Sequence, residues 1–269
     1  MNVSQQSIQK RNHVKIFGKG EKPIIFAHGF GCDQQVWDRI TPALEEQYKI
    51  YLFDYVGSGY SDKAAYDAER YRHIEGYTQD VLDICHAYNL KDVIFIGHSI
   101  SGTIGLMASI KEPELFDKVC MIGSSPHYVN EADYHGGFDM DDIDELIQMM
   151  ELNYLEWARY LAPIASKNED KPKLTDEFEQ MLLANDREIV KHFCRMTFTI
   201  DVRDQLEKAT APTLLLQSAD DTIVPFEISQ YMADRIPNST LVRMNAMGHN
   251  PHLSAPEETI DLIKNWLRK

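Results

Sequence analysis

The segment from Val93 to Gly102 limits what this chain can fold into more than any other. It opens with four apolar residues, which is typical of a buried parallel strand, and an apolar helical pattern begins directly after Ser99. A serine in so sharp a turn has strained backbone angles, so the residues two places before and after it, Gly97 and Ser101, must be small. The segment predicts a serine hydroxyl exposed at the carboxyl end of a sheet, beside a helix N-terminus.

Two further turns supply the partners that a serine nucleophile needs. A strand pattern at 214–217 ends in a polar turn that contains Asp220 and Asp221, and a second strand pattern at 240–244 leads to His249. A serine hydroxyl is a poor nucleophile until a base takes its proton. Imidazole can do so near neutral pH, and a carboxylate fixes its tautomer and stabilises the imidazolium. These residue types in this order predict nucleophilic catalysis by serine.

A fourth turn is suited to hold the negative charge that such chemistry develops. The strand pattern at 24–27 leads into His28 and Gly29, and the N–H groups of Phe30 and Ile100 are the expected oxyanion donors. Backbone donors suit this role because they are already oriented when the charge develops. The order oxyanion turn, serine, aspartate, histidine is typical of the α/β-hydrolase fold, whose serine usually lies in Gly-x-Ser-x-Gly; here a serine replaces the last glycine.

The acid of the predicted triad has two candidates, Asp220 and Asp221. In the α/β-hydrolase fold the acid usually lies four residues before a proline, as Asp221 does before Pro225. Asp221 is therefore the predicted acid, with Ser99 as the nucleophile and His249 as the base. Asp220 is expected to be a solvated turn residue.

Two other histidines near these motifs could suggest further roles. His98 adjoins Ser99, but neighbours on a strand point to opposite faces, so His98 is expected to be structural or to line the rim of the site. His249 and His252 are three residues apart in a loop that contains Pro251, and no third ligand stands nearby. We therefore predict neither a metal site nor a cofactor.

Strand and helix patterns alternate along most of the chain, which predicts a mostly parallel, twisted sheet with helices on both faces. Between 139 and 200 the pattern is helical only, with a break expected at Pro163. We predict a core formed by residues 1–123 and 201–269, with a helical cap inserted at 124–200. The expected strands are 12–17, 23–28, 48–54, 92–97, 118–123, 212–217 and 240–244, and helices are expected at 37–46, 75–88, 100–110, 175–184, 187–198, 227–236 and 256–268.

The composition restricts the partners and the compartment. Acidic residues number 42 against 27 basic ones, and the net charge of −15 argues against binding to nucleic acid or to anionic membrane surfaces. The four cysteines are scattered, as expected for free thiols in a reducing cytoplasm. The polar segment Met1–Ser7 lacks the apolar core of a secretion signal, and no apolar run approaches the length of a membrane span. A cytoplasmic protein is expected.

Three stretches carry a closer resemblance: Gly29–Gln34, Phe53–Asp62 and Tyr128–Phe138. They resemble the RsbQ-like α/β-hydrolases, bacterial energy-stress regulators related to the strigolactone and karrikin receptors of plants, which also have serine at the position of Ser101. The resemblance covers essentially the whole chain and implies the triad and oxyanion donors named above. It also implies a partner, because the bacterial regulator acts upstream of a phosphatase that carries a PAS sensory domain.

Apolar residues of the predicted cap are candidates for a substrate pocket over Ser99. Each of them could instead merely pack the cap against the core. Together with Phe30 and Ile100 they would enclose a dry pocket that selects small apolar ligands. The candidates are Phe138, Trp157, Phe193, Met196 and Phe198, with Val224 from the core.

These observations predict a serine hydrolase that acts on a small hydrophobic ester or lactone. Ser99 would attack the carbonyl carbon, His249 would carry the proton, and water would hydrolyse the acyl-enzyme. The alternatives are a slow-turnover receptor that signals through the same site, a metabolic esterase, a cofactor-free haloperoxidase and a hydrolase of carbon–carbon bonds. A dehalogenase is disfavoured because that chemistry has a carboxylate where Ser99 stands.

Overall fold

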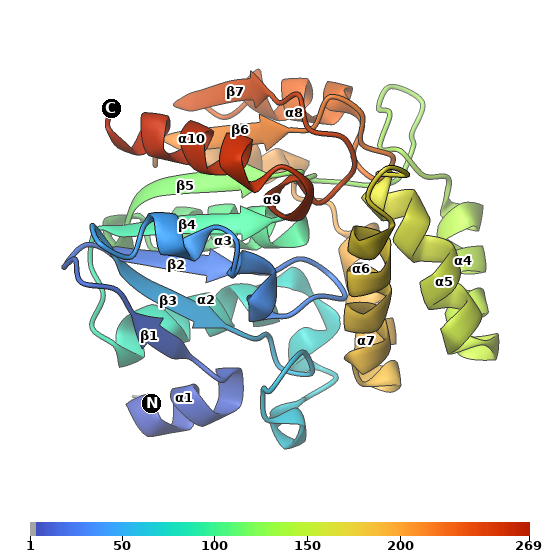
Figure 1. Cartoon of the computed structure of the whole chain (residues 1–269), viewed down its shortest axis with the longest axis horizontal. Coiled ribbons are helices and arrows are strands. Elements are labelled where there is room, and N and C mark those ends of the chain that lie inside the picture. The colour runs from blue at the N-terminus through green and yellow to red at the C-terminus, as the bar shows by residue number, and fades with distance from the viewer. Residues whose placement is uncertain (1–3) are drawn as a thin grey trace.

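The computed structural model describes residues 4–269, so the first three residues of the polar N-terminal segment lie outside it. Within this range seven strands form one sheet in the order β1-β3-β2-β4-β5-β6-β7 (Figure 1). Only β1 runs antiparallel to its neighbour, so the predicted mostly parallel sheet is confirmed. The strands are Lys15–Phe17 (β1), Pro23–Ala27 (β2), Lys49–Phe53 (β3), Val93–His98 (β4), Phe116–Ile122 (β5), Thr213–Gln217 (β6) and Ser239–Arg243 (β7).

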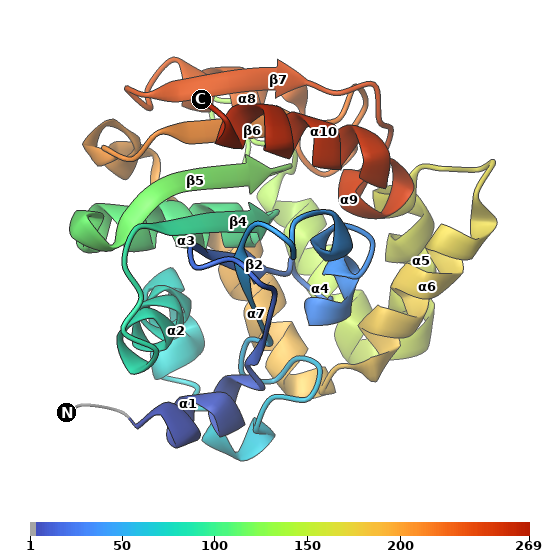
Figure 2. The ribbon, with the colours of Figure 1, turned by 60° about the vertical axis from the view of Figure 1, so that its left-hand side comes forward.

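Helices cover both faces of the sheet, as parallel crossovers require. Helices α2, α3 and α8 lie on one face and α10 lies on the other (Figures 1 and 2). The four correspond closely to predicted helices. Their bounds are Ile74–Ala87 (α2), Ile100–Lys111 (α3), Phe226–Ala233 (α8) and Pro256–Leu267 (α10), with the short α9 at Pro251–Ser254 and 3₁₀ turns at Lys63–Ala65, Arg70–Arg72, Pro113–Leu115 and Arg203–Lys208.

Four helices between β5 and β6 stand at the carboxyl ends of the strands (Figure 1). They are Met140–Leu152 (α4), Tyr154–Ser166 (α5), Pro172–Ala184 (α6) and Arg187–Thr199 (α7). The break expected at Pro163 was wrong, because Pro163 lies inside α5. Leu161 and Ala165 remain buried on either side of it, and this packing holds the last turn in place. We call these four helices the cap; its proposed limits at 124–200 stay a prediction.

Near the N-terminus one expected element was wrong and another begins later than expected. The helix expected at 37–46 is replaced by two 3₁₀ turns, Gln34–Trp37 (η1) and Thr41–Ala43 (η2). Pro42 explains the change, because it has no N–H and its ring clashes in a helix interior. The strand expected at 12–17 begins only at β1, since Asn12 ends the helix Gln5–Asn12 (α1).

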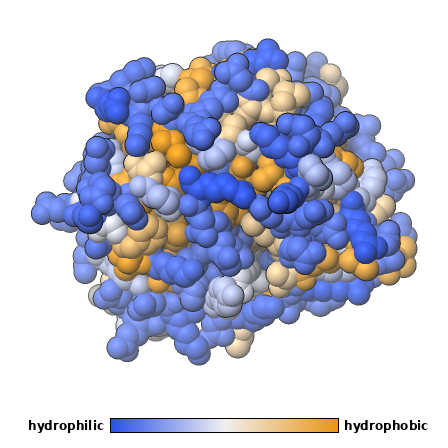
Figure 3. Space-filling view, in the orientation of Figure 1, coloured by the Kyte–Doolittle hydropathy of each residue, from blue (hydrophilic) through white to orange (hydrophobic). Residues whose placement is uncertain are grey.

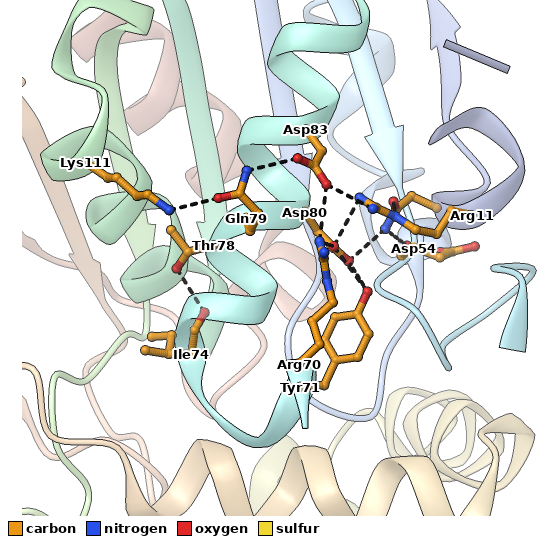
Figure 4. A network of polar contacts seen from close by, with 11 residues as sticks. Arg11, Asp54, Arg70, Tyr71, Ile74, Thr78, Gln79, Asp80, Asp83 and Lys111 are labelled. Atoms are coloured by element: carbon orange, nitrogen blue, oxygen red, sulfur yellow. Dashed lines mark hydrogen bonds and ion pairs between the residues drawn. The ribbon is translucent and has the colours of Figure 1, made fainter. Parts of the chain in front are cut away.

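A buried polar network fixes α1 to the sheet and to α2 (Figure 4). The carboxylate of Asp80 on α2 receives the guanidinium of Arg70 at 2.6 Å and that of Arg11 at 3.1 Å. The Tyr71 hydroxyl donates to it at 2.9 Å, and the side chain of Asn12 donates at 3.2 Å. Burial raises the pKa of Asp80 in spite of these partners. A lost partner would leave a buried charge uncompensated, so we infer that removing any one partner is strongly destabilising.

Apolar residues fill the interior and polar residues cover much of the surface (Figure 3). Every residue of β4 is buried, and hydrophilic side chains cover most of the face seen in Figure 3, with apolar patches between them. The four cysteines are buried and free. Among the helices of residues 4–269, none combines the length and the apolar character that crossing a membrane requires.

Candidate active site

Ser99 occupies the turn between β4 and α3 with backbone angles φ 56° and ψ −129°. Such a positive φ is uncommon for a residue with a side chain, and it marks a strained site. Two hydrogen bonds hold the turn: the Ser99 N–H donates to the carbonyl of Ile122 at 2.7 Å, and the Gly102 N–H donates to the carbonyl of Ser99 at 3.0 Å. The strain is therefore balanced by the neighbouring strand and by the first turn of the helix.

The small residues around Ser99 are required by close backbone approach. A Cβ atom at Gly97 would lie 2.5 Å from the backbone of Ser101, and one at Gly102 would collide with Ser124. Ser101 itself is fully buried, and its hydroxyl donates to the carbonyl of His28. This contact explains why the chain accepts a serine where the usual motif has glycine: the side chain has a partner on the neighbouring strand.

The three residues of the predicted triad form a continuous hydrogen-bonded line. His249 Nε2 lies 2.8 Å from Ser99 Oγ, and His249 Nδ1 lies 2.9 Å from an oxygen of Asp221. Asp221 can only accept from Nδ1–H, so Nε2 is left free to accept the serine proton. All three residues are buried. This arrangement supports the predicted roles of nucleophile, base and acid.

Asp221 is held as a carboxylate by its surroundings. Burial alone would raise its pKa, but the electrostatic interaction and hydrogen bond with His249 and the N–H groups of Val224 and Ile223 outweigh burial and lower the pKa. The Ile223 N–H donates to Asp221 at 2.8 Å and the Val224 N–H at 3.1 Å. Asp220, in contrast, is about half exposed and forms an ion pair with Lys167 at 2.6 Å. The geometry favours Asp221 over Asp220 as the acid.

The proposed oxyanion donors flank Ser99. Ile100 is the first residue of α3, and the N–H groups of Phe30 and Ile100 make no hydrogen bond to any residue in the range 4–269. His28 fixes the turn that carries Phe30: its Nδ1 lies 2.9 Å from the carbonyl of Gly29, and its Nε2 accepts from the N–H of Tyr55 at 3.2 Å. Because the Gly29 carbonyl and the Phe30 N–H share one planar peptide, His28 sets the direction of that N–H.

A small cavity lies over Ser99 between the core and the cap. Its volume is about 30 Å³, which is room for about two water molecules. Its wall is largely aromatic and aliphatic, with a few polar side chains among the apolar ones. The lining residues are Phe30, His98, Ser99, Tyr128, Leu161, Ala165, Phe178, Thr197, Phe198, Ile223, His249 and Asn250.

Of the six predicted pocket residues, only Phe198 lines this cavity. Trp157 and Phe193 lie behind Phe30, with ring centroids 6.1 and 5.8 Å from it, and Phe138 lies behind Phe198 at 5.2 Å. The remaining two are placed elsewhere: Met196 borders a separate depression on the far side of α7, and Val224 packs in the core beneath Asp221. Apolar periodicity finds a buried face without giving its distance from Ser99, so the role of these five residues in a substrate pocket stays a prediction.

Several lining residues were not among the pocket residues predicted from the sequence. Tyr128 lies in the connection after β5, and Leu161, Phe178 and Thr197 come from three different cap helices. Their convergence depends on how the cap packs, which periodicity does not encode. His98, expected to be structural or at the rim, is buried, lines the cavity and has its Nε2 2.8 Å from the carbonyl of His249.

Buried histidines form a cluster of tilted rings behind the base. The ring centroid of His98 lies 4.4 Å from that of His252, whose ring lies 4.8 Å from Trp37. Burial, together with the neighbouring histidines, lowers the pKa of His98 far below its usual value and that of His252 to about 3. Both rings therefore stay neutral at physiological pH.

One other cluster resembles a set of metal ligands. In the described part of the chain His127, Glu131 and Asp201 bring their ligand atoms within 4.8 Å of one another. The guanidinium of Arg203 already pairs with Glu131 at 2.9 Å and with Asp201 at 2.6 Å. Since the carboxylates are neutralised by an arginine, the cluster is better explained as an ion-pair network.

A strained serine follows a strand of the parallel sheet, and a histidine and an aspartate are hydrogen-bonded to it in series. This combination defines the class of serine hydrolases built on a parallel sheet. The chain belongs to the α/β-hydrolase family: the family described as "Alpha/beta hydrolase family" matches residues 24–262. It is a hydrolase of that family.

Several proteins of known name are similar to this chain over nearly its whole length. The chain is 37% identical to Karrikin insensitive 2 receptor IA of Petunia hybrida over 95% of this chain and 94% of that one. It is 34% identical to Strigolactone esterase D14 of Arabidopsis thaliana over 98% and 99%. Among solved structures, a hydrolase from Oleispira antarctica superposes with a TM-score of 0.97 and 39% identity, covering 100% of this chain and 99% of that one. The chain is thus related to the plant receptors.

Proposed function

We propose that this protein is a serine hydrolase that cleaves a small hydrophobic ester or lactone. The observation that carries the proposal is the line of hydrogen bonds from Asp221 through His249 to Ser99, which borders a small cavity. The size of the cavity favours a small acyl group. The name of the related strigolactone esterase is consistent with this chemistry.

The residues suggest a sequence of steps. Ser99 Oγ attacks the carbonyl carbon while His249 Nε2 takes its proton, and the Phe30 and Ile100 N–H groups bind the developing oxyanion. His249 then returns the proton to the leaving alcohol, which leaves an acyl group on Ser99. Water activated by the same histidine hydrolyses the ester bond and releases the acid. Asp221 orients the imidazole and stabilises its charged form throughout.

Intact-protein mass spectrometry after exposure to a p-nitrophenyl ester tests this mechanism directly. We expect a mass increase equal to the acyl group, located on Ser99 by peptide mapping and absent from Ser99→Ala. Hydrolysis without any adduct on Ser99 in rapidly quenched samples, together with unimpaired turnover by Ser99→Ala, would contradict it.

The biological role that we propose is ligand sensing of the RsbQ-like kind, upstream of a PAS-domain phosphatase. Relatives named as karrikin receptors and strigolactone esterases support a role in which ligand binding or slow hydrolysis is read by a partner. A ligand over Ser99 touches both cap and core. It can therefore shift the equilibrium between two cap positions, to the extent that it binds one of them more tightly than the other. The buried free thiols suit a cytoplasmic location.

Charge reversals on the outer face of the cap test the sensing role. Glu145 on α4 is exposed and takes part in no ion pair within residues 4–269, so Glu145→Lys alters the surface alone. Glu151 lies 3.4 Å from Lys191, so Glu151→Lys also removes a pair within the cap. We expect such variants to weaken binding of a PAS-domain phosphatase in a pull-down while ester hydrolysis is kept. A metabolic esterase is the better account if no partner is recovered and no cap variant separates the two activities.

A further inference from the structure

The hydroxyl of Thr197 is a buried polar group with no partner. Thr197 is 2% exposed, lines the cavity from α7, and its Oγ1 makes no hydrogen bond to any residue that the structure describes. A threonine in a helix usually donates to the carbonyl four residues earlier. Thr199 on the same helix does so, to Arg195 at 2.7 Å, and Thr78 on α2 does so at 3.0 Å. Thr197 lacks this hydrogen bond and lies where α7 borders the cavity.

Other unpaired polar groups surround the same cavity. The Tyr128 hydroxyl, the side-chain amide of Asn250 and His98 Nδ1 are buried, and the described part of the chain offers them no partner. Burial raises the pKa of Tyr128, so its hydroxyl stays protonated and able to donate. Each of these groups lowers stability unless something in the cavity binds it, so the wall is suited to a ligand that carries polar atoms.

We propose that Thr197 recognises a second oxygen of the substrate, so that the buried half of the preferred ester or lactone carries an ether, hydroxyl or carbonyl oxygen beyond the scissile group. This inference rests on the proposed esterase activity. The Thr197 hydroxyl can donate to any of these oxygens. A hydrocarbon chain of the same shape leaves the hydroxyl unpaired and is bound less well. The preferred substrates are therefore small oxygenated esters, rather than the purely apolar ones that the sequence predicts.

Matched substrate pairs and an isosteric variant test the proposal. Thr197→Val keeps the shape of the side chain and removes the hydroxyl. In the first pair, p-nitrophenyl methoxyacetate has an oxygen where p-nitrophenyl butyrate has a methylene in the acyl half. In the second pair, 2-methoxyethyl acetate has an oxygen where n-butyl acetate has a methylene in the alcohol half. For each pair kcat/KM is measured, and the ratio of oxygenated to hydrocarbon substrate is compared between variant and wild type. Intrinsic reactivity cancels in this comparison.

We expect Thr197→Val to lower that ratio about tenfold for at least one pair, which is the effect of one lost hydrogen bond. Thr199→Val is the matched control, because its hydroxyl is bound within the helix and lies outside the cavity. It should leave both ratios unchanged. The melting temperature of Thr197→Val should equal or exceed that of wild type, since the variant removes an unpaired buried hydroxyl.

Two results would overturn the proposal. If the ratio of kcat/KM for oxygenated and hydrocarbon substrate is the same in Thr197→Val and wild type for both pairs, the Thr197 hydroxyl binds only water. A clear loss of melting temperature in Thr197→Val would mean that the hydroxyl has a structural partner. Failure of the esterase proposal would look different from both results. In that case the wild-type protein would hydrolyse none of the four esters and would form no adduct on Ser99.

Discussion

At the scale of single residues, each group around Ser99 has one protonation state that permits reaction. Asp221 is held ionised by His249 and two backbone N–H groups although it is buried. That charge keeps the proton of His249 on Nδ1, and Nε2 faces Ser99 as a free base. The reactivity of Ser99 therefore depends on groups that themselves never contact the substrate carbonyl.

Removing either end of the proton path should abolish turnover. Ser99→Ala and His249→Ala are each expected to lower kcat on p-nitrophenyl acetate by on the order of a million-fold. Circular dichroism should show that both variants fold, since neither change alters the buried apolar core. Turnover by Ser99→Ala comparable with wild type would require a different nucleophile.

The two neighbouring aspartates should differ sharply. Asp221→Asn is expected to lower kcat by roughly ten thousand-fold, because an amide favours the wrong imidazole tautomer. Asp220→Asn removes only an exposed ion pair with Lys167, and such pairs contribute roughly 0–1 kcal/mol. Steady-state kinetics of both variants decide the matter, and the opposite ranking would assign the acid to Asp220.

At the scale of elements, the oxyanion turn after β2 and the start of α3 are joined by one buried hydroxyl. Ser101 donates to the His28 carbonyl, and its oxygen lies 3.1 Å from the hydroxyl of Tyr55. Since the Ser101 proton is used on His28, the Tyr55 hydroxyl is the donor in the second bond. We infer that these two hydrogen bonds hold the peptide of Phe30 at a fixed distance from Ser99.

Removing the Ser101 hydroxyl should therefore affect the transition state more than substrate binding. We expect Ser101→Ala to lower kcat about tenfold with little change in KM, less than the roughly 10²–10³ lost with a whole oxyanion donor. Binding of an alkyl boronic acid, which mimics the tetrahedral intermediate, should weaken in parallel. Tyr55→Phe keeps the bond to His28 and should have a smaller effect. A rise in KM alone would point to a role in the pocket instead.

The sequence predicts those parts of the site that lie at strand ends. His28, Ser99 and His249 each follow a strand pattern, and parallel strands bring their carboxyl ends to one edge of the sheet. The cavity wall could not be predicted in this way. Phe198 lines it while Met196, two residues earlier, is turned away, because the angular position of α7 depends on its packing against other elements.

At the scale of the whole molecule, cap and core meet through aromatic rings. Phe193 of α7 stacks on Tyr77 of α2 with ring centroids 4.6 Å apart, and it also touches the edge of Phe30 at 5.8 Å. Phe30 carries an oxyanion donor and lines the cavity. A ligand that moves Phe30 would therefore act on the rings that seat the cap, which is the coupling that the sensing role needs.

The cluster of buried histidines should make global stability depend on pH. The pKa of His252 is about 3 in the folded protein, against about 6.5 in an unfolded chain. Unfolding therefore takes up a proton below pH 6.5. The free energy of unfolding that the neutral ring contributes is complete above that pH and is lost as the pH falls towards 3. For this one group the loss between pH 7.5 and pH 5 is about 2 kcal/mol.

Replacing the ring by one that cannot titrate isolates this effect. His252→Phe keeps an aromatic side chain against Trp37, and neither nitrogen of His252 has a partner among the described residues to lose. Urea denaturation at pH 7.5 and pH 5 should show a smaller loss of stability in His252→Phe than in wild type. Part of the loss should remain, because the pKa of His98 is also strongly lowered by burial. Parallel stability–pH curves for the two proteins would mean that His252 does not stay neutral in the folded state, and the acid sensitivity would then belong to His98 or to the carboxylates.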